Sequence, residues 1–201
     1  MPGHKGKGES ESLDITEIDG ADVLYNASGI IKESEDNAAA LFESGRTLYS
    51  AEGSSLSVRA MLYLAVLYAK VCGRRPLIAA GRNAHKTFIS AAALLDFDID
   101  WLYGDGSIMS CGITGEKLES YFEKAESLPV AVYVTSPDYL GNLLDVASLA
   151  KVCHAHGVLL LVDNAHGAYL KFLKEDMHPI TLGADVCCDS AHKTLPVLTG
   201  G

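Results

Sequence analysis

The sequence predicts an α/β fold in which helices cover both faces of a mostly parallel sheet. Apolar runs of strand length alternate with longer segments whose apolar residues recur at helical spacing, a pattern typical of parallel sheets with right-handed crossovers. Residues 158–162 are apolar throughout, as expected of a strand that is buried on both faces. The chain has 201 residues, of which 48% are hydrophobic, so it can form one domain with a sizeable core.

The expected elements follow one another along the chain. Residues 1–36 are polar and glycine-rich, so we expect an irregular N-terminal segment there and one large domain over residues 37–201. Gly73 and Gly157 would end two helices, and Asp145 would cap the start of another. Helices are expected at residues 35–43, 54–72, 84–95, 116–127 and 145–156. Strands are expected at residues 46–51, 76–80, 99–103, 130–135, 158–162 and 184–188.

The composition narrows the class of protein. The formal net charge of −10 argues against a nucleic acid or an anionic membrane as partner. No apolar run approaches the length of a membrane span, and the polar start does not resemble a signal peptide. The five cysteines are odd in number and irregularly spaced, which favours reduced thiols in a cytoplasmic protein.

Polar, glycine and aromatic residues follow five of the expected strands. In an open parallel sheet, ligands bind beyond the carboxyl ends of the strands. These segments should therefore form one rim of ionisable and hydroxyl groups. They are residues 52–55, 81–86, 136–139, 163–167 and 189–194.

The last rim segment contains Lys193, which could form a Schiff base with a carbonyl group. Ser190 and His192, which precede it, could donate hydrogen bonds to a phosphate. Pyridoxal phosphate meets both demands. For this segment alone, the alternative is a surface loop with a solvated lysine.

Two other rim segments suit the charged ends of the same cofactor. Gly53, Ser54 and Ser55 open a helix, whose free N–H groups could hold a phosphate, although an ordinary serine cap is the alternative. Asp163 at a buried strand end needs a partner, and a protonated pyridine nitrogen would serve. A cap on the following loop is the alternative.

The ring of the cofactor also has candidate neighbours. Ala165 is small enough to let a ring lie flat, and His85 could stack on the other face of the ring. His166 could touch the ring or a substrate carboxylate. The alternatives are a histidine at a helix start for His85 and a surface turn for His166.

Other motifs lack necessary parts. There is no phosphate loop of the GxxxxGK[ST] type to accompany residues 163–166, and residues 104–106 lack the third glycine of a dinucleotide fingerprint. No GxSxG elbow is present. The histidines and cysteine of residues 153–156 match no common zinc pattern, so we expect no metal.

The chain resembles the major domain of the Orn/Lys/Arg decarboxylases, bacterial pyridoxal-phosphate enzymes of the aspartate-aminotransferase fold (fold type I). The resemblance covers nearly the whole chain. It is carried by residues 2–6 (PGHKG), 14–17 (DITE), 29–33 (GIIKE), 82–86 (RNAHK), 161–167 (LVDNAHG) and 190–195 (SAHKTL).

The resemblance implies a role for each rim residue. Lys193 would be the Schiff-base lysine, Asp163 would pair with the pyridine nitrogen, and His85 would lie on the ring. The phosphate would be held by Ser54, Ser55, Ser190 and His192. The implied reaction is α-decarboxylation of lysine, ornithine or arginine to the amine and CO₂, in polyamine biosynthesis, by a cytoplasmic homodimer or higher homo-oligomer.

The chain also departs from the family pattern. Glu52, Leu56 and Val58 replace polar residues of the phosphate loop, Asp138 replaces an uncharged residue, and Asn164 replaces a common glutamate. Family members continue past the lysine into a C-terminal domain, so we expect a large domain truncated at its C-terminal side. Two alternatives therefore stay open: another fold-type-I reaction (aldolase, lyase or aminotransferase), or a non-catalytic binding or assembly chain.

Overall fold

The computed structural model describes residues 20–104 and 110–197. The matching segments at residues 2–6 and 14–17 therefore lie outside the described residues. The chain divides into two compact units, Met1–Ser50 and Ala51–Gly201.

The described part of the first unit contains a short 3-10 helix, η2 (Leu24–Asn26), and the helix α1 (Ile30–Phe42). The carboxylate of Asp22 accepts backbone N–H bonds from Ser28, Gly29 and Ile31 at 2.8–2.9 Å. The backbone bonds of Ser28, foremost, and of Gly29 hold the pKa of Asp22 well below its usual value. The helix therefore starts inside the segment expected to be irregular, because its cap lies well before it in the sequence.

The prediction of a strand at residues 46–51 is wrong. Residues 46–50 form no strand. The backbone N–H of Tyr49 donates instead to Oε1 of Glu35 at 3.0 Å, and Glu35 is only 4% exposed. The Tyr49 N–H, which in a strand would donate to a neighbouring strand, thus donates to a side chain of α1.

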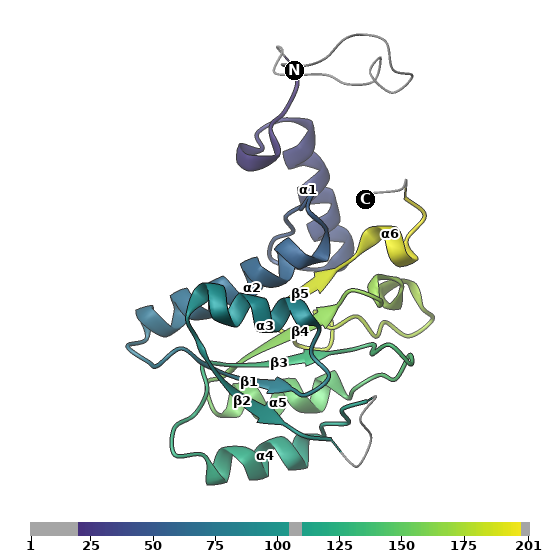
Figure 1. Cartoon of the computed structure of the whole chain (residues 1–201). Coiled ribbons are helices and arrows are strands. Elements are labelled where there is room, and N and C mark those ends of the chain that lie inside the picture. The colour runs from purple at the N-terminus through teal and green to yellow at the C-terminus, as the bar shows by residue number, and fades with distance from the viewer. Residues whose placement is uncertain (1–19, 105–109, 198–201) are drawn as a thin grey trace. The chain divides into compact units, whose positions relative to one another are not determined.

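The second unit is a five-stranded parallel sheet, so the α/β prediction is confirmed (Figure 1). The strand order is β2-β1-β3-β4-β5. The register pairs Thr135 with Asp163 and Asn164 with Asp189, which brings the carboxyl ends of three strands level. The strands are β1 (Leu77–Gly81), β2 (Asp98–Leu102), β3 (Ala131–Thr135), β4 (Leu159–Asn164) and β5 (Val186–Asp189).

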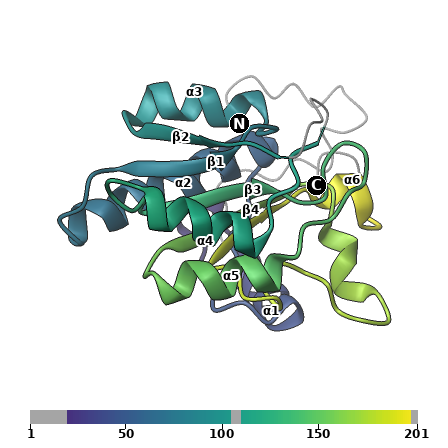
Figure 2. The ribbon, with the colours of Figure 1, turned by 90° about the horizontal axis from the view of Figure 1, so that it is seen from below.

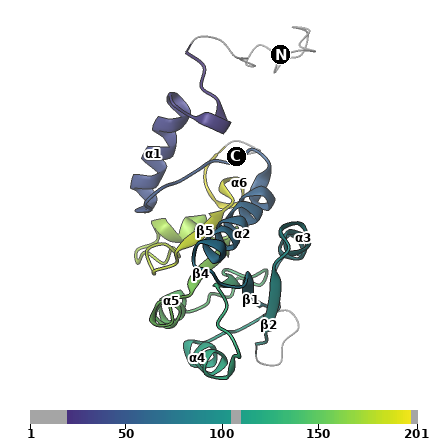
Figure 3. The same ribbon diagram turned by 90° about the vertical axis from the view of Figure 1, so that its left-hand side faces the viewer.

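Helices cover both faces of this sheet (Figures 2 and 3). The helices α2 (Gly53–Val71) and α3 (Lys86–Leu95) lie on one face. The helices α4 (Gly115–Lys124) and α5 (Val146–Ala155) lie on the other. Two short helices, η3 (Ala168–Phe172) and α6 (Ala191–Thr194), follow β4 and β5.

The core is split by the alternation of side chains along the strands. Ile78 and Tyr133 are fully buried against α2 and α3, whereas Ala79 and Val132 face α4 and α5. By length and composition alone, α2 is apolar enough to cross a membrane. Its buried residues, Val58, Met61, Leu62, Ala65, Val66 and Ala69, identify it instead as a core helix of the sheet.

Candidate active site

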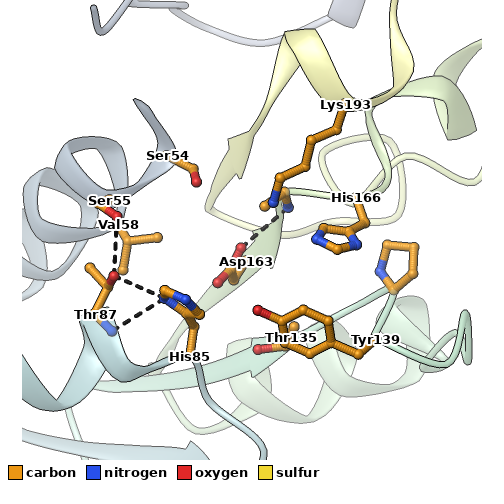
Figure 4. Close-up of a pocket in the computed structure, with 12 residues that line it drawn as sticks. Ser54, Ser55, Val58, His85, Thr87, Thr135, Tyr139, Asp163, His166 and Lys193 are labelled. Carbon is orange, nitrogen blue, oxygen red and sulfur yellow. Dashed lines mark hydrogen bonds between the residues drawn. The ribbon is translucent and has the colours of Figure 1, made fainter. Parts of the chain in front are cut away.

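A pocket opens at the carboxyl ends of the strands in the second unit (Figure 4). Its empty volume is about 480 Å³, which includes the open solvent at its mouth. The loops after β1, β3 and β4, the start of α2 and the helix α6 all contribute to it. Its lining residues are Ser54, Ser55, Val58, His85, Thr87, Thr135, Pro137, Tyr139, Asp163, Ala165, His166 and Lys193.

The carboxylate of Asp163 is held by neutral donors at the end of β4. Its Oδ2 accepts from the Tyr133 hydroxyl at 2.9 Å, and its Oδ1 accepts from the Ala165 backbone N–H at 3.2 Å. Asp163 is 4% exposed, and within residues 20–104 and 110–197 it forms no ion pair. A buried carboxylate at the wall of a cavity, without an ion pair, suits a cationic ligand group.

The hydroxyl of Tyr133 stays protonated in this environment. Burial raises the pKa of Tyr133 well above its usual value, and the charge of Asp163 raises it further. The phenol is therefore a fixed donor to Asp163. Its ring is fully buried and lies 4.6 Å, centroid to centroid, from the ring of Phe88.

Lys193 stands on α6, directly after β5. Its side chain is exposed and points into the pocket toward Asp163 and His166 (Figure 4). The turn that presents it is closed by a hydrogen bond from the Lys193 backbone N–H to the carbonyl of Ser190 at 3.2 Å. The amine of α6 and the buried carboxylate of β4 thus share one cavity.

His166 completes this side of the pocket. Burial lowers the pKa of His166, the positive charge of Lys193 lowers it further, and Asp163 opposes the shift only in part. The imidazole is therefore neutral near pH 7, so it can accept or donate a proton. The Tyr139 ring packs edge-on against it, with centroids 5.3 Å apart.

His85 forms the opposite side of the pocket and also caps α3. Its Nδ1 accepts from the Thr87 backbone N–H at 3.2 Å and lies 2.9 Å from the Thr87 hydroxyl. That hydroxyl is in turn 3.2 Å from Oγ of Ser55 on α2. The cap that the sequence left as an alternative is thus present, and the same ring lines the pocket (Figure 4).

The start of α2 provides backbone donors at the pocket. Gly53 has φ +68°, a conformation that favours glycine, and Ser54 and Ser55 follow it into the lining. The first N–H groups of a helix have no partner within the helix, so they can bind an anion. Glu52, the residue before the helix, is exposed and does not line the pocket.

The structure brings together seven of the residues singled out in the sequence: Ser54, Ser55, His85, Asp163, Ala165, His166 and Lys193. Gly53, Ser190 and His192 are not among the lining residues. Ser190 is buried, with its Oγ 3.4 Å from Nδ1 of the exposed His192. Asp138 turns away into its own loop, where its carboxylate accepts from the Leu140 and Asn142 backbone N–H groups at 2.9 Å.

Sequence reasoning missed three residues that shape the site: Thr87, Tyr133 and Tyr139. Tyr139 lies within a rim segment without having been assigned a role. Tyr133 carried a usable signal, since a tyrosine in a buried strand needs a partner for its hydroxyl. Thr87 carried none, because it lies one residue inside a helix and its partner Ser55 is far away in the sequence.

Comparisons with known proteins agree with this architecture. A model of the family "Orn/Lys/Arg decarboxylase, major domain" matches residues 8–201. The uncharacterized protein YaaO of Bacillus subtilis is 32% identical over 94% of this chain and 39% of its own length. An arginine decarboxylase of Bacillus subtilis is 31% identical over 96% of this chain and 41% of its own length. The chain thus spans about two fifths of the length of these relatives.

Solved structures show the same fold. Mouse CSAD superimposes with a TM-score of 0.68 at 24% sequence identity, over 84% of this chain and 38% of that one. Pyridoxal phosphate is the cofactor of the matched family. With the sheet, the rim of polar strand ends and the family match all in agreement, the chain belongs to the Orn/Lys/Arg decarboxylase family and corresponds to its major domain.

Proposed function

We propose that the pocket binds pyridoxal phosphate and that the chain is the cofactor-binding part of an enzyme that removes the α-carboxylate of a basic amino acid. One observation carries the proposal. The amine of Lys193 and the buried carboxylate of Asp163 open into the same cavity, with His85 across from them (Figure 4). This set of donors and charges fits the groups of pyridoxal phosphate.

Four of the lining residues would hold the cofactor. Asp163, held by its hydrogen bond from the Tyr133 hydroxyl, would bind the protonated ring nitrogen. Ser54, Ser55 and the start of α2 would bind the phosphate, and His85 would cover one face of the ring. When bound, pyridoxal phosphate supplies an electron sink for cleavage of the bond between Cα and the carboxylate.

Lys193 and His166 would hold protons beside the reacting carbon. Lys193 carries an amine that can form the covalent link to the cofactor and exchange protons at Nζ. His166 lies next to it as a neutral imidazole, so it can take up a proton there or give one up. We propose that these two groups control protonation at the substrate face of the pocket.

The choice of a basic substrate is supported by the relatives named as arginine decarboxylases. Decarboxylation of such a substrate would give an amine of the kind used in polyamine synthesis. We further propose a homodimer acting in the cytoplasm, in line with the free cysteines of the described chain. Neither a nucleic acid nor a membrane is proposed as a partner.

Covalent trapping tests the cofactor site. The chain is mixed with pyridoxal phosphate, reduced with borohydride, and digested for mass spectrometry. One reduced cofactor is expected on Lys193, together with visible absorption of the bound cofactor before reduction. Lys193→Ala should lose both signals, whereas Lys151→Ala, on the far helix α5, should keep them. A label on other lysines, or no absorption at all, would contradict the proposal.

Product analysis tests the reaction. The cofactor-loaded chain is incubated separately with arginine, lysine and ornithine, and CO₂ and the amine are measured. The proposal expects CO₂ and the amine from one of the three. A keto acid or an aldehyde as product would indicate a different fold-type-I reaction. Cofactor binding without turnover of any of the three would favour the non-catalytic alternative for this chain.

A further inference from the structure

We propose that His178, Cys187 and Asp189 form a binding site for a divalent transition-metal ion, and that zinc is the ion that fits it. The cluster lies outside the pocket lining described above and has no part in the proposed decarboxylation. Nitrogen, sulfur and carboxylate oxygen are the three ligand types that zinc takes in proteins.

The three residues meet because of the geometry of β5. Cys187 and Asp189 are two apart on one strand, so their side chains point to the same face of the sheet. Cys188, between them, points the other way and donates to the carbonyl of Ser54 at 3.6 Å. His178 reaches the same face from the loop that connects η3 to β5.

The ligand atoms already have nearly the spacing of a zinc site. Nε2 of His178 is 3.1 Å from Oδ2 of Asp189, and Sγ of Cys187 is 3.5 Å from that oxygen and 3.9 Å from Nε2. A tetrahedral zinc ion with bonds of about 2.0–2.3 Å separates its ligand atoms by roughly 3.3–3.6 Å. The three atoms thus form one face of such a tetrahedron after shifts of a few tenths of an ångström.

A neighbouring group orients one of these ligands, as outer-shell partners do in metal sites, and another anchors the loop that carries His178. The Asn164 side-chain amide donates to Oδ1 of Asp189, which leaves Oδ2 directed at the cluster. The His178 backbone N–H donates to Asp176 at 2.9 Å, and Asp176 forms an ion pair with Lys171 at 2.6 Å. The loop that carries His178 is therefore held in place before any ion arrives.

The site is buried yet reachable. The His178 side chain is 1% exposed, whereas that of Asp189 is 25% exposed. An ion can enter beside Asp189, and a water molecule can complete the fourth position there. The bound form of cysteine is the thiolate, so binding releases the thiol proton of Cys187 to solvent. The competing explanation is a trio joined only by hydrogen bonds, and that trio would bind no ion.

Metal titration separates the two explanations. The full chain, stripped of metal with a chelator, is titrated with zinc chloride against a chromophoric chelator, and in parallel with cobalt chloride. One equivalent of zinc is expected to bind, and cobalt should give the near-ultraviolet thiolate band and the visible bands of a tetrahedral site. In Cys187→Ser the thiolate band should vanish and the zinc affinity should fall at least about tenfold.

Matched variants make the outcome decisive. His178→Asn and Asp189→Asn should weaken zinc binding to a similar degree, whereas Cys72→Ser, which removes an exposed thiol outside the cluster, should bind like the wild type. Circular dichroism checks that each variant is folded. If Cys187→Ser does not fold, Asp189→Asn serves as the test in its place. The proposal is overturned if the wild type binds no stoichiometric zinc, or if folded Cys187→Ser or Asp189→Asn binds it equally well.

Discussion

The hydrogen bond between Tyr133 and Asp163 joins a phenol to a carboxylate inside the sheet. Both residues are nearly inaccessible to solvent, at 0% and 4% exposure, so water cannot replace either partner. A bond to a charged group in such a place contributes more than a surface bond does. This contact should therefore matter both for stability and for the shape of the pocket.

Replacing Tyr133 by phenylalanine should lower the free energy of unfolding by about 1.5–3 kcal/mol, because Oδ2 of Asp163 loses its buried donor. Urea denaturation measures this loss. The matched control is Tyr121→Phe, which removes a 2.7 Å phenol–carboxylate bond to Asp100 at a half-buried position. Water can replace that bond, so a smaller loss is expected. Equal losses in the two variants would contradict the role given to burial.

The buried thiol of Cys153 gives a test that depends on pH. Burial, reinforced by the charge of Asp185, raises the pKa of Cys153 from 9.0 to about 12. Below the ordinary pKa both the folded and the unfolded thiol are protonated, and the full stability is present. As pH rises toward about 12, the unfolded thiol ionises while the folded one does not, so stability is lost.

The wild type should therefore lose up to about 1.4 kcal/mol of unfolding free energy per pH unit more than Cys153→Ala over this window. Urea denaturation at a series of pH values from about 9 upward gives both slopes. Parallel curves for the two proteins would show that the thiol does not titrate in this way.

At the scale of elements, the sequence predicted the sheet well because its strands are short apolar runs between clear helix stops. The five strands of the second unit lie within a few residues of their expected positions. The expected strand at residues 46–51 failed because its backbone donor is taken by Glu35 of α1. The early start of α1 was missed because the Asp22 carboxylate caps it from outside the usual capping position, a contact that the capping rules for adjacent residues do not report.

The candidate site was predictable to the extent that it lies at strand ends. Asp163 lies near the end of β4, His166 just beyond it and Lys193 shortly after β5. Parallel strands bring their carboxyl ends to one edge of the sheet. Ser190 and His192 precede the lysine but do not line the pocket, because the side chains of a short helical turn point in different directions. Contacts between elements, such as that of Ser55 with Thr87, required the three-dimensional structure.

The connection after β4 depends on a glycine. A Cβ added to Gly167 would lie 2.0 Å from Oδ1 of Asn164 and 2.6 Å from Cδ of Pro137, and Asn164 is fully buried. Gly167→Ala should therefore destabilise the protein by about 1–3 kcal/mol and disturb the turn that carries Ala165 and His166. Thermal unfolding measures the first effect, and cofactor affinity measures the second.

Gly112→Ala is the control for this substitution, since nothing lies within 4 Å of a Cβ added there. It should unfold at nearly the wild-type temperature. If both glycine variants are equally stable, the close approach at Gly167 is not a real constraint.

At the scale of the whole molecule, the pocket belongs to one unit. Its lining residues run from Ser54 to Lys193, all within Ala51–Gly201. A chain beginning at Ala51 should thus bind pyridoxal phosphate as tightly as the whole chain, as measured by titration of the visible absorption. A marked loss of affinity in a fragment that is folded by circular dichroism would show that the first unit contributes to the site.

The position of β5 in the sheet has a further consequence. Among the described strands β5 pairs with β4 alone, so alternate backbone amides of β5 have no neighbour in the ladder. A strand that is paired on one side only should separate from the sheet more readily. The amide hydrogens of β5 should therefore exchange with solvent sooner than those of β3. A ligand bound both to Lys193, beyond β5, and to Asp163, on β4, would link the two strands. Binding in the pocket should therefore slow amide hydrogen exchange in β5.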